Sequence, residues 1–143
     1  MICYFDTSAF VPLLIPEASS LVCRRLWDDA DDVLTTQLTY VETAGALAQA
    51  VRGGRITEAR QTEALGELDD YWNELNMIEI TNRLLRRAAG LTFLEALRGY
   101  DAMQCASAES IGEQDLIFAS GDRQLLKAGA NLGFHVADVN EPI

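Results

Sequence analysis

The chain has 143 residues, of which 49% are hydrophobic, and its formal net charge is −11. This length and apolar content predict one folded domain over residues 1–143 and argue against disorder. The acidic balance argues against a nucleic-acid binder that relies on bulk electrostatics. It does not exclude a nuclease, because metal ions can bring positive charge to the site itself.

The start of the chain has no basic segment, and Asp6 interrupts the first apolar run, so no signal peptide is expected. No apolar stretch approaches the length of a transmembrane helix. The three cysteines are scattered and form no C-x-x-C pair, which is typical of reduced, buried thiols. The single histidine, His135, argues against a zinc site. We therefore expect a soluble, cytoplasmic protein without a membrane partner.

The first strand is predicted over residues 2–5, an apolar run suited to a strand buried on both faces. The run ends at Asp6, and Thr7 and Ser8 precede an apolar, helix-like stretch over residues 9–14. A carboxylate at the carboxyl end of a buried parallel strand lies where open α/β sheets bind ligands. Asp6 also has a structural interpretation as a helix N-cap. The functional interpretation requires partner carboxylates at the same edge of the sheet.

The middle of the chain alternates two further strands, over residues 33–36 and 77–80, with helices. Thr39 and Glu42 fit a capping box at the start of one of these helices, which is the structural interpretation of Glu42. Helical apolar spacing and start and stop signals predict helices over residues 18–29, 39–50, 56–74 and 82–97.

A helix of small and apolar residues is predicted over residues 102–111, with Asp101 as its N-cap. The fourth strand, residues 116–119, is followed by the tight turn Ser120-Gly121-Asp122, in which the glycine gives the backbone unusual freedom. A helix over residues 123–130 comes next. Asp122, like Asp6, therefore comes just after a buried strand.

A fifth, marginal strand is expected over residues 133–136, with His135 as a packed or edge residue, and residues 138–143 are expected to form a tail. Strands that alternate with helices in this order predict a largely parallel sheet with helices on both faces.

Four acidic residues thus occupy comparable places around one edge of the predicted sheet. They are Asp6, Glu42, Asp101 and Asp122. Clustered carboxylates repel one another unless a cation neutralises them, and hard oxygen ligands select Mg²⁺ or Mn²⁺. The chemistry that fits this arrangement is metal-assisted hydrolysis of a phosphodiester.

Four motifs carry a resemblance to a known family. They are Phe5-Asp6-Thr7-Ser8-Ala9, Tyr40-Val41-Glu42, Leu97-Arg98-Gly99-Tyr100-Asp101-Ala102 and the closing stretch from Phe118 to Leu125. In this order, and over nearly the whole chain, the sequence resembles PIN-domain proteins of the VapC type, the toxins of toxin–antitoxin pairs.

The resemblance implies a PIN-like three-layer α/β/α sandwich whose parallel sheet has five strands in the order 3-2-1-4-5. It implies an endoribonuclease that depends on Mg²⁺, or on Mn²⁺. The expected partners are an RNA substrate, a cognate antitoxin protein and a second copy of the chain.

The resemblance also implies roles for individual residues. Asp6 and Asp101 should be the main metal ligands, and Glu42 and Asp122 should complete the catalytic pocket, directly or through water. Supporting hydroxyls that orient a carboxylate or a water are expected at Thr7, Ser8 and Ser120. Arg98 and Arg123 flank the motifs and are candidates for phosphate contacts.

Two other enzyme classes lack a required group in this sequence. A haloacid-dehalogenase-type phosphatase needs a second Asp two residues after the first, where this chain has Ser8. A response-regulator receiver needs an Asp after the third strand and a Lys after the fifth, whereas Thr81-Asn82 follows the third strand and the only lysine, Lys127, precedes the fifth. The alternative outside enzymes is a catalytically degenerate PIN-fold protein that acts only as a binding partner.

Overall fold

A five-stranded parallel sheet forms the middle layer of the computed structural model, which describes residues 1–141. The strand order is β3-β2-β1-β4-β5, as the resemblance implied. Tyr4 of the central strand pairs with Leu34 on one side and with Phe118 on the other. The strands are β1 (Ile2–Phe5), β2 (Asp32–Thr36), β3 (Asn76–Ile78), β4 (Ile117–Ser120) and β5 (His135–Asp138).

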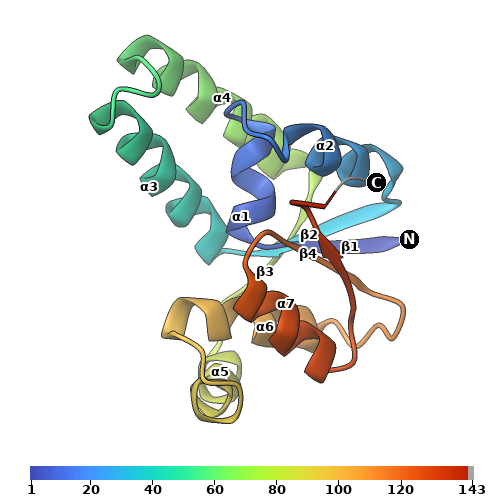
Figure 1. Cartoon of the computed structure of the whole chain (residues 1–143). Coiled ribbons are helices and arrows are strands. Elements are labelled where there is room, and N and C mark those ends of the chain that lie inside the picture. The colour runs from blue at the N-terminus through green and yellow to red at the C-terminus, as the bar shows by residue number, and fades with distance from the viewer. Residues whose placement is uncertain (142–143) are drawn as a thin grey trace.

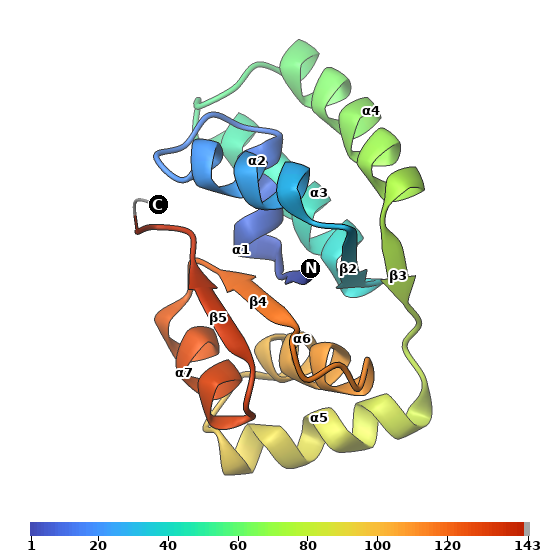
Figure 2. The same ribbon diagram turned by 90° about the vertical axis from the view of Figure 1, so that its right-hand side faces the viewer.

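Helices cover both faces of this sheet. Figures 1 and 2 show α1 to α4 on one face and α5 to α7 on the other, so that the layers form the expected α/β/α sandwich. Within residues 1–141 the helices are α1 (Thr7–Phe10), the 3-10 helix η1 (Val11–Leu13), α2 (Ser20–Asp29), α3 (Leu38–Arg52), α4 (Glu58–Glu74), α5 (Asn82–Leu94), α6 (Gly99–Ser110) and α7 (Arg123–Asn131).

The central strand contributes to a hydrophobic core on each face, because successive side chains of a strand point to opposite sides. Phe5 packs in one core with Phe10, and Tyr4 packs in the other with Phe118. The Tyr4 and Phe118 rings are stacked with their centroids 5.4 Å apart. Both faces of β1 are therefore buried, which explains its continuous apolar sequence.

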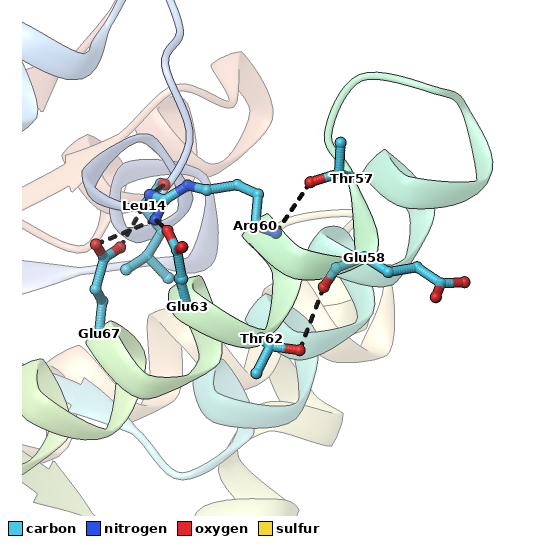
Figure 3. A network of polar contacts seen from close by, with 7 residues as sticks. All are labelled: Leu14, Thr57, Glu58, Arg60, Thr62, Glu63 and Glu67. Atoms are coloured by element: carbon cyan, nitrogen blue, oxygen red, sulfur yellow. Dashed lines mark hydrogen bonds and ion pairs between the residues drawn. The ribbon is translucent and has the colours of Figure 1, made fainter.

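The side chain of Arg60 in α4 contacts the end of η1 (Figure 3). Its Nη2 donates hydrogen bonds to the carbonyl oxygen of Leu14 at 2.7 Å and to Glu67 Oε2 at 3.0 Å. Its Nη1 lies 3.4 Å from Glu63 Oε2. The same helix begins at the N-cap Thr57, whose Oγ1 accepts from the Arg60 backbone N–H at 3.0 Å. The segment that follows Asp6 and α1 is thereby fixed to the outer layer.

Several predicted boundaries are wrong by a few residues. The predicted helix 82–97 ends at Leu94, because Ala96 adopts a left-handed conformation with φ 53°. The third strand spans Asn76–Ile78 instead of 77–80. The fifth strand is His135–Asp138 instead of 133–136, because Gly133 turns the chain first, at φ 93°. Of the predicted tail, residues 142 and 143 lie outside the described part.

The environment of the cysteines and of the histidine agrees with the predictions. Cys3, Cys23 and Cys105 are buried and free. His135 is exposed in β5, the strand at one edge of the sheet. In the part of the chain that the structure describes, no helix is both long and apolar enough to cross a membrane.

Candidate active site

A pocket of about 360 Å³ lies at the carboxyl edge of the sheet, where β1 and β4 end. Residues of α3 and α6 line it as well, and the four acidic residues come from four separate segments of the chain. All four predicted acids line this pocket: Asp6, Glu42, Asp101 and Asp122. The structure thus brings together the carboxylates that the sequence predicted at one edge.

Asp6 is the most deeply buried of the four acids, with 2% of its surface exposed. It is the N-cap of α1, and its Oδ1 accepts from the Ala9 N–H at 3.0 Å and from Ser8 Oγ at 2.7 Å. Its Oδ2 accepts from Ser120 Oγ at 2.7 Å. Burial raises the pKa of Asp6 from 3.8 to about 6; the nearby charge of Asp122 raises it further, and the three hydrogen bonds lower it. Asp6 therefore caps α1 and lines the pocket, so the predicted cap and the predicted site position fall on the same residue.

The turn after β4 lies beside Asp6 and carries Asp122 into the pocket. Ser120 is fully buried, and its Oγ accepts from the Asp122 N–H at 3.0 Å while it donates to Asp6. Asp122 is the N-cap of α7, since its Oδ1 accepts from the N–H groups of Gln124 at 2.8 Å and Leu125 at 3.2 Å. One Asp122 oxygen thus holds the helix, and the residue still lines the pocket.

Gly121 is closely packed and does not adopt a backbone conformation that only glycine favours. It is not among the glycines with positive φ in the described chain. A Cβ at this position would lie 3.2 Å from Asn140 Nδ2 and 3.3 Å from Val139 Cγ2. Its N–H donates to Ser8 Oγ at 2.8 Å. The turn therefore contacts the same hydroxyl that supports Asp6, and the predicted role of this glycine in chain flexibility is wrong.

Glu42 is held by side chains and not by a capping box. Because α3 already begins at Leu38, after Gln37, Thr39 lies within the helix instead of capping it. Glu42 Oε1 accepts from Thr7 Oγ1 at 2.7 Å and from Gln104 Nε2 at 2.9 Å. The capping-box interpretation is therefore wrong, and the predicted supporting role of Thr7 is directed to Glu42.

Asp101 lies in the first turn of α6 and is not its N-cap, because the helix starts at Gly99 with Arg98 in the cap position. Partial burial raises the pKa of Asp101, and the negative charges of Asp122 and Glu42 raise it further. The positive charge of Arg98 acts in the opposite direction. The carboxylates are thus close enough to repel one another across the pocket.

Two further polar residues that line the pocket were missed from the sequence. Gln104 is 2% exposed and lies one helical turn after Asp101, so the i, i+3 spacing could have indicated it. Glu17 belongs to an irregular segment between η1 and α2, which has no periodicity that could indicate a site. It forms an ion pair with Arg55 at 3.3 Å.

The two arginines predicted to contact phosphate are not part of the pocket wall in the described structure. Arg98 instead lines a neighbouring apolar cavity of about 590 Å³, together with Tyr100 and Met103. Arg123 is exposed at the start of α7. The phosphate contacts of both residues remain predictions.

The chemistry of these side chains fits a hydrated divalent cation. No ion pair within residues 1–141 includes any of the four acids. No three His, Cys, Asp or Glu side chains of these residues form a ready-made metal cage. Mg²⁺ does not require such a cage, because it keeps several waters and usually binds one or two carboxylates. A cluster of mutually repelling carboxylates, of which Asp6 is buried and the other three are partly buried, is a suitable environment for it when none of them forms an ion pair in the described chain.

Sheet order and pocket define the class of protein: a three-layer α/β domain with an acidic pocket at the carboxyl edge of its parallel sheet. The family model described as the PIN domain matches residues 3–131. The chain belongs to the PIN-domain family.

Relatives and solved structures agree with this assignment. The chain is 38% identical to Ribonuclease VapC45 of Mycobacterium tuberculosis over 94% of its own length and 93% of that protein. The solved structure of M. tuberculosis VapC20, described as a Sarcin-Ricin loop cleaving toxin, has a TM-score of 0.69 at 20% identity and covers 89% of this chain and 95% of VapC20. The solved structure of VapBC2 from Rickettsia felis, bound to a DNA fragment from the promoter, has a TM-score of 0.66 at 14% identity. The match covers 96% of this chain and 100% of that chain. The two structures support the fold.

Proposed function

We propose that this chain is a metal-dependent endoribonuclease that hydrolyses RNA phosphodiester bonds and serves as the toxin of a toxin–antitoxin pair. The observation that carries the proposal is the convergence of four carboxylates on one pocket without a cationic partner in the described chain. The 38% identity to a protein named Ribonuclease VapC45 supports RNA as the substrate class.

Each side chain has a role in this proposal. Asp6 and Asp101 hold Mg²⁺ or Mn²⁺, and Glu42 and Asp122 complete the pocket, directly or through water. A divalent cation held by these residues would act as a Lewis acid, which would activate water and stabilise charge on the attacked phosphate. Supporting hydrogen bonds from Ser8, Ser120 and Thr7 fix the carboxylates.

The protein partner in this proposal is a cognate antitoxin. The solved neighbour VapBC2 is a complex, which supports a partner chain for this fold. We expect the partner to cover the acidic pocket, and an inserted basic side chain would complement its charge. A homodimer remains a prediction from the family resemblance.

The decisive experiment measures cleavage of a mixed pool of structured and single-stranded RNAs with Mg²⁺, with Mn²⁺ and with EDTA. The wild type is compared with Asp6→Asn and Asp101→Asn, which preserve side-chain size and remove charge. Asp115→Asn is the matched control, because Asp115 is exposed before β4 and does not line the pocket. We expect metal-dependent cleavage that both pocket variants lose and the control keeps.

Two results would contradict this proposal. Cleavage that survives both pocket substitutions would show that the carboxylates are not the catalytic groups. A folded, partner-free wild type that cleaves none of the RNAs would favour the alternative, a degenerate PIN-fold protein that only binds a partner.

A further inference from the structure

Gln104 is a buried polar side chain at the back of the acidic pocket, and every polar atom of its amide has a partner. Its Nε2 lies 2.9 Å from Glu42 Oε1, 3.3 Å from Thr7 Oγ1 and 3.2 Å from Thr39 Oγ1. Its Oε1 accepts from the Tyr4 hydroxyl at 2.7 Å. Gln104 therefore links the central strand β1 to a pocket carboxylate on α3.

The orientation of this amide follows from the charge beside it. An ionised carboxylate only accepts hydrogen bonds, so the NH₂ end of Gln104 must face Glu42. The amide oxygen then points to Tyr4, whose hydroxyl can donate to it. Tyr4 is fully buried and stacked on Phe118, so its hydroxyl has a fixed position. The core on one face of the sheet thus determines the position of the amide.

The two carboxylate oxygens of Glu42 differ in their hydrogen bonds. Oε1 accepts from both Thr7 and Gln104, which occupies its two lone pairs. Oε2 has no hydrogen-bond partner among the described residues, and Glu42 lines the pocket. Asp6 differs in part, since its Oδ1 also has two donors but its Oδ2 has one.

We infer that Gln104 is a positioning residue, which together with Thr7 engages Glu42 Oε1 and leaves Oε2 as the only oxygen presented to the bound cation or its water. This inference rests on the proposed function, because it assigns Gln104 a role toward the proposed metal site. Partners of this kind that orient a ligand typically change metal affinity or activity about 10- to 100-fold when removed.

The test is a double-mutant cycle between Gln104→Met and Glu42→Gln, which uses the full chain. Methionine retains the length and volume of glutamine but cannot donate a hydrogen bond. There are two readouts. Mn²⁺ affinity is measured from the electron paramagnetic resonance signal of the free ion, and activity is the cleavage rate of an RNA that the wild type cuts. Thr43→Val is the matched control: Thr43 follows Glu42, is buried, and its hydroxyl has no partner within the described residues.

We expect Gln104→Met to weaken Mn²⁺ binding or cleavage about 10- to 100-fold in the wild-type background. In the Glu42→Gln background the same change should have less than about a twofold effect, because the group it positions has already lost its charge. Thr43→Val should stay within about twofold of the wild type.

Equal losses in both backgrounds, or no loss in the wild type, would overturn the inference. If Gln104→Met does not fold, Tyr4→Phe replaces it in the same cycle, since it removes only the hydroxyl that orients the amide; coupling to Glu42 is again expected, and its absence overturns the inference. Failure of the proposed function has a different signature, because Asp6→Asn would then cleave RNA as well as the wild type does.

Discussion

The Asp6 carboxylate shows how a buried acid can be unfavourable for folding and useful for binding. Its pKa is raised to about 6 by burial, although three donors stabilise its charged form. A pKa of about 6 in place of 3.8 corresponds to a loss of about 3 kcal/mol of folding free energy at neutral pH. Because a bound cation would relieve this cost, the unfavourable charge is consistent with a metal ligand.

The pH dependence of stability should reveal this cost in metal-free buffer. Below pH about 4 the carboxyl is protonated in both states, and no cost arises. From there to pH about 6 the folded state binds the proton more tightly, so the free energy of unfolding attributable to Asp6 falls as the pH rises. Above pH about 6 the cost is constant.

Asp6→Asn should therefore stabilise the chain by about 1–3 kcal/mol at pH 7.5 in EDTA. The difference from the wild type should shrink toward zero as the pH is lowered to about 4. Urea unfolding of both proteins at several pH values measures it. An Asp6→Asn variant that is less stable than the wild type at pH 7.5 would show that the hydrogen bonds to Asp6 outweigh its desolvation.

Among the secondary-structure elements, α4 makes a polar contact with the end of η1 through the side chain of Arg60. Arg60 is two-thirds buried, and its guanidinium contacts Glu67 and the Leu14 carbonyl oxygen. A hydrogen bond from a charged donor to a buried carbonyl contributes more to the free energy of unfolding than an exposed ion pair does. The reason is that a buried carbonyl left without a donor carries a desolvation cost.

Arg60→Met should lower the free energy of unfolding by about 1–2 kcal/mol, since the Leu14 carbonyl loses its charged donor. Arg55→Met is the control: Arg55 is more exposed, and its contact with Glu17 is 3.3 Å long, so its removal should change stability by less than about 0.5 kcal/mol. Chemical denaturation in 0.1 and 1 M NaCl measures both. Equal effects of the two substitutions would refute a special role for Arg60.

For the molecule as a whole, the net charge of −11 and the acidic pocket both favour cation binding. A ligand that binds only the folded state stabilises it by about 2.7 kcal/mol at one hundred times its dissociation constant. General screening by salt would also stabilise so acidic a chain. Specific binding must therefore be separated from ionic strength.

Mg²⁺ should raise the melting temperature of the wild type more than NaCl at matched ionic strength does. Because Asp6→Asn and Asp101→Asn remove proposed ligands, they should lose this excess, whereas Asp115→Asn should keep it. Differential scanning fluorimetry provides the measurement. If Mg²⁺ and NaCl have equal effects on the wild type, specific binding at the pocket is ruled out.

Local patterns in the sequence predicted a parallel sheet with helices on both faces and four acids at one edge of it, whereas the strand order came from the family resemblance. A continuous apolar run marked β1, and alternating strands and helices indicated the parallel sheet, because burial on both faces leaves a direct trace in the sequence. Asp6 directly follows β1 and Asp122 lies in the turn after β4, so both could be predicted, because the carboxyl ends of parallel strands meet at one edge.

Only the tertiary structure decided how these acids are held and charged. The donor to Asp6 Oδ2 is Ser120, 114 positions away in the chain, and the partner of Glu42 is Gln104, 62 positions away. The raised pKa of Asp6 likewise depends on burial by segments from the whole chain. Desolvation and the geometry of hydrogen bonds between distant segments act through space, so neither has a local sequence signal, whereas periodicity, strand ends and the short-range cap of α1 by Asp6 do.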